Sequence, residues 1–146
     1  MAGESLVTGR VERLRAELEP LGARSFLVTN PVNVRYLTGF ESSNAALLAR
    51  PDSTLLLTDG RYQEAARKIE GVELVTADRG LLEDIGDRLG ELGEGPVAFE
   101  ADHLTVADHE ALSADGTELV PARGVVSRLR SVKDEEELDT IRRAAR

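Results

Sequence analysis

Residues 30–40 read Asn-Pro-Val-Asn-Val-Arg-Tyr-Leu-Thr-Gly-Phe and directly follow a β-rich run at residues 25–29. The proline disfavours a helical conformation at Asn30 and suits the first turn of a helix, so we expect the strand to end here and a short helix to begin. Gly39 is expected to close that helix. This stretch therefore predicts a strand, a change of direction and a short helical turn.

Three polar side chains, Asn33, Arg35 and Tyr36, are crowded onto that short helix. Segments just beyond strand ends are where α/β folds usually place binding groups, which favours a binding role. The alternative is structural: the two asparagines of the stretch satisfy local backbone groups, the tyrosine packs in the core with its apolar neighbours, and the arginine lies on the surface. Residue spacing alone leaves both interpretations open.

Strand-like and helix-like segments alternate along the rest of the chain. β-rich runs predict strands at 25–29, 45–49, 54–58, 72–76, 97–99 and 118–121. Apolar spacing predicts further helices at 8–20, 61–69, 81–92, 105–112, 125–129 and 134–146. Thr8 is the expected N-cap of the first and Pro20 its expected stop, while Thr105 and Asp108 fit a capping box. With a hairpin turn at 50–53, this pattern predicts an α/β fold, a mixed six-stranded sheet with helices on both faces.

Composition excludes several classes of function. The 146 residues are 41% hydrophobic, which is enough for one domain with its own core. With 18 basic against 27 acidic residues the formal net charge is −9, which would repel nucleic acid. The sequence has no cysteine and no apolar stretch long enough to span a membrane. We therefore expect a cytoplasmic protein with neither a nucleic-acid nor a membrane partner.

The sequence carries no pattern for catalysis or cofactor binding. His103 and His109 are six positions apart and would lie on different faces of a helix, so a shared metal ion is not expected. The motifs of serine hydrolases and of phosphate-binding loops are absent. We expect no catalytic residue, no metal and no cofactor in this chain.

The helix expected from residue 134 has no Gly, Asn or Pro to stop it before Arg146. We therefore expect the chain to be part of a longer protein. The expected organisation is a domain at 1–130 followed by the start of a linker helix at 131–146.

Three segments together resemble one known family. Residues 30–40 are similar to the signature of the amino-terminal domain of creatinases, prolidases and X-Pro aminopeptidases (aminopeptidase P), the M24-type metallopeptidases. Residues 56–62, Leu-Leu-Thr-Asp-Gly-Arg-Tyr, are similar to the second landmark of that domain. The third similarity is to the linker helix that leads into the family's catalytic domain, and it is carried by Arg130, Lys133, Glu137, Leu138, Ile141 and Ala144. The three segments occur in the family's order and span nearly the whole chain.

The resemblance implies the fold of the creatinase/prolidase N-terminal domain, which is ribonuclease H-like. It implies a parent protein that is an X-Pro dipeptidase or aminopeptidase, a hydrolase whose pita-bread catalytic domain holds two metal ions, usually manganese, cobalt or zinc. Those ions bind to two Asp, one His and two Glu of that domain, so this chain alone would be non-catalytic. The implied partners are its own C-terminal catalytic domain, a second copy in a homodimer, and a proline-containing peptide substrate.

In this family the amino-terminal domain supports dimer formation and helps to wall the active-site entrance, often that of the neighbouring subunit. By resemblance, Asn33, Arg35 and Tyr36 are the substrate-access candidates. An asparagine can hydrogen-bond an amine or a carbonyl, an arginine can hold a carboxylate bidentately, and a tyrosine can pack or donate. Asp59 is assigned to structure as a helix cap, with Arg61 as its ion-pair partner.

Two alternatives stay open. One is a binding module from a creatinase-like homologue without metal ligands, which the sequence after Arg146 would reveal. The other is a free-standing signalling domain of receiver type. The alternation of strands and helices points to it, but Thr29 and Asn30 stand where an acidic cluster would be needed.

Overall fold

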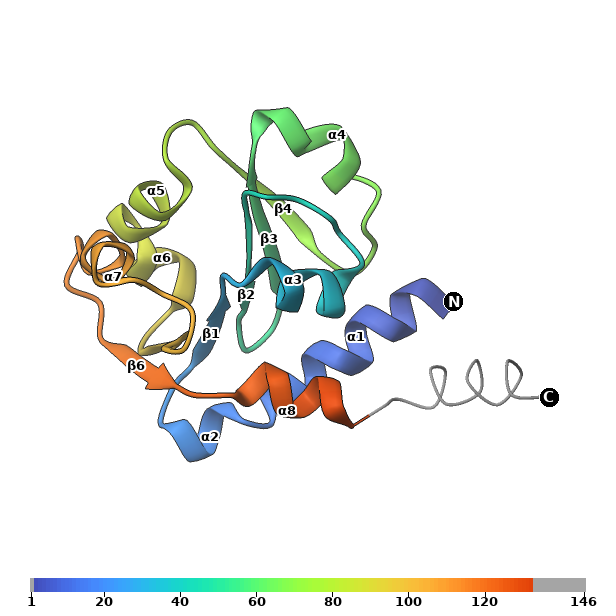
Figure 1. The fold of residues 1–146 in the computed structure, drawn as a ribbon, viewed down its shortest axis with the longest axis horizontal. Coiled ribbons are helices and arrows are strands. Elements are labelled where there is room, and N and C mark those ends of the chain that lie inside the picture. Colours follow the sequence, from blue (N-terminus) through green and yellow to red (C-terminus); the bar gives the residue numbers. More distant parts are fainter. Residues whose placement is uncertain (1, 133–146) are drawn as a thin grey trace.

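A mixed six-stranded sheet forms the centre of the molecule in the computed structural model. The structure describes residues 2–132, with side chains for residues 7–132. The strands lie in the order β4-β3-β2-β1-β5-β6 (Figure 1). Their bounds are Ser25–Val28 (β1), Ala45–Ala49 (β2), Thr54–Asp59 (β3), Glu73–Ala77 (β4), Val97–Glu100 (β5) and Leu119–Ala122 (β6). The predicted fold class is confirmed, and each strand lies close to its predicted range.

One strand, β2, runs against the direction of all the others. It is antiparallel to β1 and β3, whereas the pairs β1–β5, β5–β6 and β3–β4 are parallel. A receiver-type domain would need an all-parallel sheet of flavodoxin-like strand order, so that alternative does not fit this topology.

The central strands are apolar on both faces because both faces are buried. In β1, Phe26 and Val28 face one core, and Leu27 between them faces the other. The predicted hairpin joins β2 to β3, and the N–H of Arg50 donates to the carbonyl oxygen of Ser53 at 2.8 Å to close its turn.

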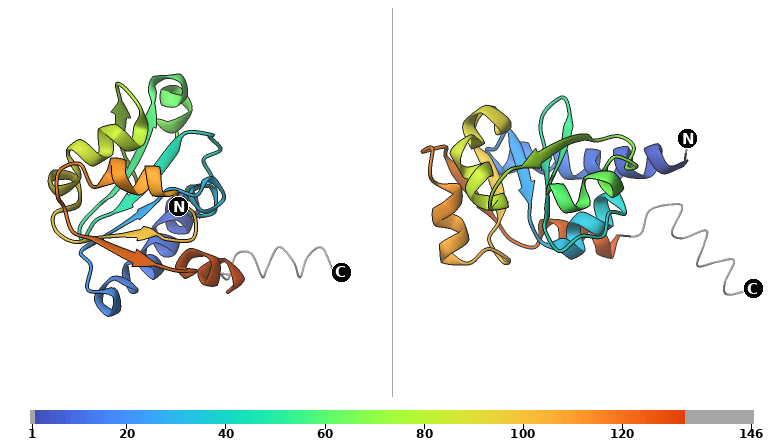
Figure 2. Two further views of the ribbon diagram at one scale, coloured as in Figure 1. Left: turned by 60° about the vertical axis from the view of Figure 1, so that its left-hand side comes forward. Right: turned by 90° about the horizontal axis from the view of Figure 1, so that it is seen from above.

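Helices cover both faces of the sheet (Figure 2). One face is covered by α1 (Ala2–Arg15), α2 (Leu18–Leu21), α3 (Pro31–Thr38), α4 (Gln63–Ala66) and α8 (Val125–Ser131). The other is covered by α5 (Leu81–Asp87), α6 (Leu89–Gly93) and α7 (Val106–Leu112). A 3₁₀ turn, η1 (Gly60–Tyr62), leads into α4. Two apolar cores result, one on each side of the sheet.

The first helix differs from its predicted bounds. Thr8 does not cap it, because α1 begins at Ala2, and Pro20 does not end it, because α1 already ends at Arg15. Pro20 lies instead inside the short helix α2, which Gly22 ends with a φ of 71°. A proline is tolerated there because the first N–H groups of a helix have no intrahelical acceptor.

The helix predicted at 81–92 is divided into α5 and α6 at Arg88, whose φ of −138° and ψ of 24° leave the helical region. Gly86 and Gly90 each lower helix propensity by about 1 kcal/mol relative to alanine, which weakens a continuous helix here. Gly86 also lies directly against α7: a Cβ atom at this position would be 1.9 Å from the carbonyl oxygen of Ala111. The missing side chain therefore lets α5 and α7 pack backbone to backbone.

The capping box predicted for α7 is present. The N–H of Asp108 donates to Thr105 Oγ1 at 3.1 Å, and the N–H of Thr105 donates to Asp108 Oδ2 at 3.2 Å. The helix predicted from residue 134 lies outside the described residues, and the boundary predicted after residue 130 stays a prediction. Among the described helices, none combines the length and the apolar character needed to cross a bilayer.

Candidate functional site

Helix α3 begins at the edge of the sheet where three parallel strands end. Strands β1, β5 and β6 run in the same direction, so their carboxyl ends meet at this edge. Asn30 follows β1 and caps α3: its Oδ1 accepts a hydrogen bond from the N–H of Val32 at 3.1 Å. Gly39, with a φ of 80°, ends the helix after Thr38. The predicted strand, turn and short helix are confirmed.

A buried carboxylate, Glu100, holds the start of α3. Its Oε1 accepts hydrogen bonds from the N–H groups of Thr29 at 2.7 Å and Asn30 at 2.8 Å. Its Oε2 accepts a hydrogen bond from Asn33 Nδ2 at 2.5 Å. Negative charge is favourable at the N-terminus of a helix because the free N–H groups there carry partial positive charge. Glu100 is only 8% exposed, so its carboxylate lies almost entirely out of bulk solvent.

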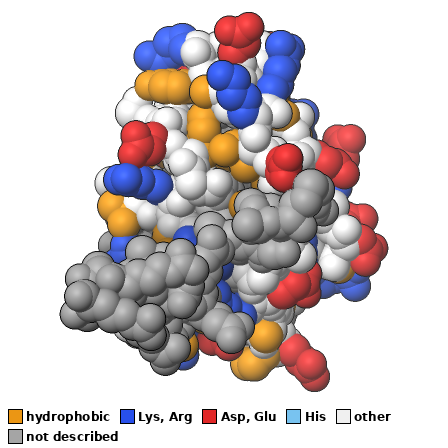
Figure 3. Space-filling view, turned by 90° about the vertical axis from the view of Figure 1, so that its right-hand side faces the viewer, with side chains coloured by type: hydrophobic (Ala, Val, Ile, Leu, Met, Phe, Trp, Pro, Cys, Tyr) orange, Lys and Arg blue, Asp and Glu red, His pale blue; other side chains and the backbone are white. Residues whose placement is uncertain are grey.

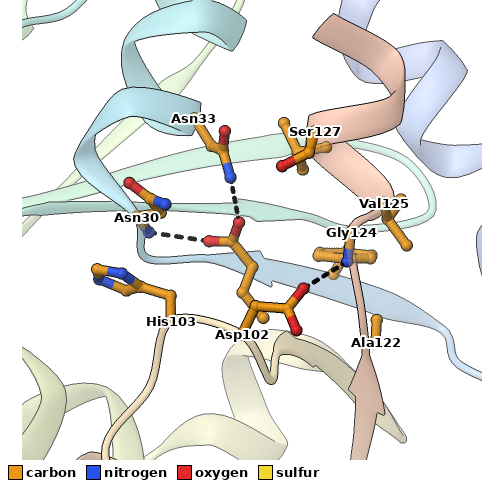
Figure 4. A pocket seen from close by; sticks show the side chains of 11 residues that line it. Asn30, Asn33, Asp102, His103, Ala122, Gly124, Val125 and Ser127 are labelled. Atoms are coloured by element: carbon orange, nitrogen blue, oxygen red, sulfur yellow. Dashed lines mark hydrogen bonds between the residues drawn. The ribbon is translucent and has the colours of Figure 1, made fainter. Parts of the chain in front are cut away.

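A small polar cavity lies beside this carboxylate, between α3, the end of β5 and the start of α8 (Figure 4). Its volume is about 40 Å³, room for a few water molecules. The polar side chains that line it are Asn30, Asn33, Glu100, Asp102, His103 and Ser127. Asp102 Oδ2 accepts the N–H of Gly124 at 2.6 Å and so fixes the chain just before α8. Two helices border the cavity, and each is held near its start by a carboxylate: α3 by Glu100 and α8 by Asp102.

The three access candidates have different surroundings. Asn33 is 3% exposed and points inward to Glu100, and its Oδ1 has no hydrogen-bond partner among the described residues. The Arg35 side chain points outward, 66% exposed, and its Nη2 lies 2.9 Å from Glu41 Oε1. Tyr36 is half-buried. The structure thus brings Asn33 together with Glu100 rather than with Arg35.

Tyr36 links three helices. Its hydroxyl donates to the carbonyl oxygen of Leu129 in α8 at 3.1 Å. The buried guanidinium of Arg10 in α1 lies 4.2 Å from the centre of its ring and donates to its carbonyl oxygen. A cation over an aromatic face is attracted by the ring quadrupole, so these contacts hold the middle of α3 against α1 and α8.

The second sequence landmark packs beside the first. Asp59 caps η1 by accepting the N–H of Arg61 at 2.8 Å, and its Oδ2 lies 2.9 Å from Arg61 Nη2. Asn44 Nδ2 also donates to Asp59 Oδ2, at 2.6 Å. The side-chain hydrogen bonds from Arg61 and then from Asn44 hold the pKa of the Asp59 carboxyl well below its usual value of 3.8. The rings of Phe40 and Tyr62 meet edge to face with centroids 6.4 Å apart. Asp59 and Arg61 therefore have the structural roles that the sequence assigned to them.

Comparison with known proteins identifies this arrangement. The family model for the Creatinase/Prolidase N-terminal domain matches residues 10–132. The chain belongs to this family. The match contains the first two landmarks, residues 30–40 and 56–62, and the predicted family is confirmed.

Relatives of this creatinase/prolidase N-terminal domain include named peptidases. The uncharacterized peptidase YqhT of Bacillus subtilis is 31% identical over 140 residues, which is 94% of this chain. The Xaa-Pro dipeptidase from Bacillus anthracis has a TM-score of 0.82 at 28% identity and covers 91% of this chain. The N-terminal domain of the cytoplasmic peptidase PepQ from Mycobacterium tuberculosis has a TM-score of 0.75 at 37% identity, covering 84% of this chain and 98% of that one.

The chain spans only part of the full-length relatives. It covers 40% of the Bacillus subtilis peptidase and 38% of the Bacillus anthracis dipeptidase. A further solved relative, 34% identical with a TM-score of 0.70, is the corresponding domain of a protein proposed to be a metallopeptidase, from Corynebacterium diphtheriae. The creatinase/prolidase N-terminal domain is therefore one part of larger peptidases in these relatives.

The described residues of this domain do not suit a metal ion: no group of three or more His, Asp or Glu side chains is placed to hold one. His103 lines the polar cavity, whereas His109 packs its ring 5.1 Å from that of Phe99. The two imidazoles therefore lie in different environments.

Sequence reasoning missed Glu100 and Arg10, the two charged side chains that hold α3. A signal for Glu100 was available: it is an acid at the end of an apolar strand, and that strand ends beside the one that leads into Asn30. Arg10 gave no comparable signal, because it was one of several arginines on a helix with acidic neighbours.

Proposed function

We propose that this creatinase/prolidase N-terminal domain is the non-catalytic domain of an X-Pro dipeptidase or aminopeptidase, where it contributes to substrate access and dimer formation. The observation that carries the proposal is the family match over residues 10–132, together with a dipeptidase relative that extends well beyond the matched domain. In that parent enzyme the hydrolysis belongs to the catalytic domain and its two divalent metal ions, manganese, cobalt or zinc.

The exposed side of α3 is the part of the domain that would meet a substrate. Arg35 is paired only with Glu41 in the described structure, and both side chains are about two-thirds exposed, 66% and 68%. An exposed pair of this kind contributes little to stability, so the guanidinium is available to exchange its partner for the carboxylate of a peptide. Val32, on the same helix, is 56% exposed and offers an apolar contact beside it.

The described part of the face shown in Figure 3 suits a peptide or a second protein copy better than a strongly charged partner. Figure 3 views the side of the molecule on which α4 and the start of α1 lie. Acidic and basic side chains alternate over its visible part, with apolar atoms exposed between them. We propose a homodimer in the cytoplasm for the parent enzyme, and the description of the Mycobacterium tuberculosis relative as a cytoplasmic peptidase supports that location.

Proline release separates the proposal from its rivals. The purified chain, incubated with an Xaa-Pro dipeptide and Mn²⁺, is expected to release no more proline than a protein-free control, whereas the chain with its downstream sequence is expected to hydrolyse the dipeptide. Turnover that copurifies with the isolated chain would refute its non-catalytic role. A downstream sequence without the two Asp, one His and two Glu would favour the binding module of a metal-free homologue.

A further inference from the structure

Glu100 connects parts of the domain that are far apart in sequence. It lies 67 positions after Asn33, yet it accepts the Asn33 amide together with the two N–H groups that precede α3. Asp102, the next acid along the chain, holds the N–H of Gly124 before α8. The last residue of β5 and the connection just after it thus hold the starts of both helices.

The Asn33–Glu100 contact has a defined orientation. Asn33 Nδ2 must face the carboxylate, because the opposite orientation would place the partial negative charge of Oδ1 against a carboxylate oxygen, with no proton between the two acceptors. No Lys or Arg is among the residues that line the adjacent cavity, so N–H donors rather than a cation satisfy this carboxylate on the cavity side. Hydrogen bonds to a charged acceptor are stronger than neutral ones, and burial strengthens them further.

We infer that Glu100 is a positioning residue: its carboxylate, through Asn33 and the end of β1, sets the placement of α3 and therefore of Arg35 at the substrate entrance. The inference rests on the proposed function. Helix α3 has only eight residues, and Glu100 holds its first turn while Tyr36 and Arg10 hold its second half. Loss of the Glu100 contact leaves α3 free to pivot about Tyr36, and a displacement of about 1 Å at a substrate-positioning group is enough to change kinetics strongly.

An exchange of the two side chains tests the inference in the full-length enzyme. Asn33→Asp places two carboxylates face to face, and we expect KM for an Xaa-Pro dipeptide to rise several-fold while kcat changes little. Adding Glu100→Gln restores a donor–acceptor pair of opposite direction, because the new amide at position 100 donates to the new carboxylate at position 33, and KM is expected to return towards the wild-type value. Asp115→Asn is the matched control, since Asp115 also accepts backbone N–H groups, from Gly90 at 2.7 Å and Thr117 at 2.9 Å, but away from α3.

The outcomes distinguish this inference from the function on which it rests. If Arg35→Ala raises KM but Asn33→Asp does not, or if the double substitution fails to rescue KM, the positioning role of Glu100 is refuted and the proposed function stands. If neither Arg35→Ala nor Asn33→Asp changes KM, the positioning role of Glu100 and the substrate-access part of the proposed function are both refuted.

A second measurement applies even if Asn33→Asp fails to fold. In this chain carrying Glu100→Ala, which removes the acceptor, NMR amide exchange at Thr29 and Asn30 is expected to accelerate, while exchange at Asp108 in the α7 capping box is unchanged. Unaltered exchange at Thr29 and Asn30 would overturn the inference.

Discussion

The hydroxyl of Tyr36 donates a hydrogen bond to the carbonyl oxygen of Leu129 at 3.1 Å and so joins α3 to the last turn of α8. Tyr36 belongs to the first landmark of the family, and Leu129 directly precedes Arg130, the first residue of the third landmark. The contact therefore packs the first landmark against α8, the helix in which the third landmark begins.

Replacing Tyr36 by phenylalanine removes this hydrogen bond and keeps the ring under the Arg10 guanidinium. We expect the free energy of unfolding to fall by about 1 kcal/mol, the usual net value of one partly buried hydrogen bond. Urea denaturation followed by circular dichroism measures it. Tyr62→Phe is the control, because its hydroxyl contacts Ser43 Oγ at 2.9 Å in an exposed position. An equal loss of unfolding free energy in both variants would mean that the Leu129 contact stabilises the fold no more than the exposed Tyr62 contact does.

Replacing two glycines by alanine is expected to have opposite effects on stability, because one lies where α5 and α7 meet and the other has open space around it. Gly86→Ala would put a Cβ atom 1.9 Å from the Ala111 carbonyl oxygen, and we expect a loss of about 1–3 kcal/mol from the resulting overpacking. Gly9→Ala, inside α1 with nothing within 4 Å, is expected to gain about 0.5–1 kcal/mol because alanine favours the helix. Thermal unfolding of both variants tests this, and an unchanged midpoint for Gly86→Ala would contradict the packing described for α5 and α7.

The Asp59 cap predicts a dependence of stability on acid pH. Because Arg61 and Asn44 lower the pKa of Asp59 in the folded state, the stabilisation is complete above the unfolded pKa of about 3.9 and is lost as pH falls towards the lower folded pKa. The stability difference between the wild type and Asp59→Asn should therefore shrink below about pH 4. NMR titration of the Asp59 carboxyl should show a higher midpoint in Arg61→Ala, and an identical midpoint would show that the guanidinium does not hold the charge.

The Asn33–Glu100 pair predicts coupling in a double-mutant cycle of stability. Asn33→Asp alone is expected to cost about 3 kcal/mol, because it buries two carboxylates without a cation between them. With Glu100→Gln added, the double variant should be more stable than Asn33→Asp alone, with a coupling of about 1–3 kcal/mol. Additive losses would mean that the two side chains do not interact in solution.

Most of the fold was predictable because local rules and the tertiary structure agree. Pro31 and Gly39 bound α3 as expected, since one suits the first turn of a helix and the other adopts a positive φ. The end of the first helix was mispredicted. Pro20 lies in the first turn of the next helix, α2, where a proline does not oppose a helix, so it does not mark the end of α1. Local signals at Arg88 were likewise too weak to show where α5 ends.

Less of the site could be predicted, because its contacts join distant parts of the chain. Spacing places Asn33 and Arg35 on one short helix, but it cannot show that Asn33 turns to a carboxylate 67 positions away while Arg35 remains in solvent. The structural interpretation is right for Arg35 as regards exposure and incomplete for Asn33, whose side-chain partner is not local backbone. Their roles in substrate access stay a prediction.

The most direct test of the central claim, that α3 serves substrate access in an X-Pro peptidase, is the kinetics of the full-length enzyme carrying Arg35→Ala. Arg128→Ala is the matched control, because its side chain is 67% exposed and lies 3.0 Å from Glu17 in a similar ion pair. We predict that Arg35→Ala raises KM for an Xaa-Pro dipeptide about tenfold, the effect of losing one charge-assisted hydrogen bond to substrate, with unfolding free energy changed by less than about 0.5 kcal/mol. Kinetic constants equal to those of Arg128→Ala on every proline-containing substrate would contradict the account.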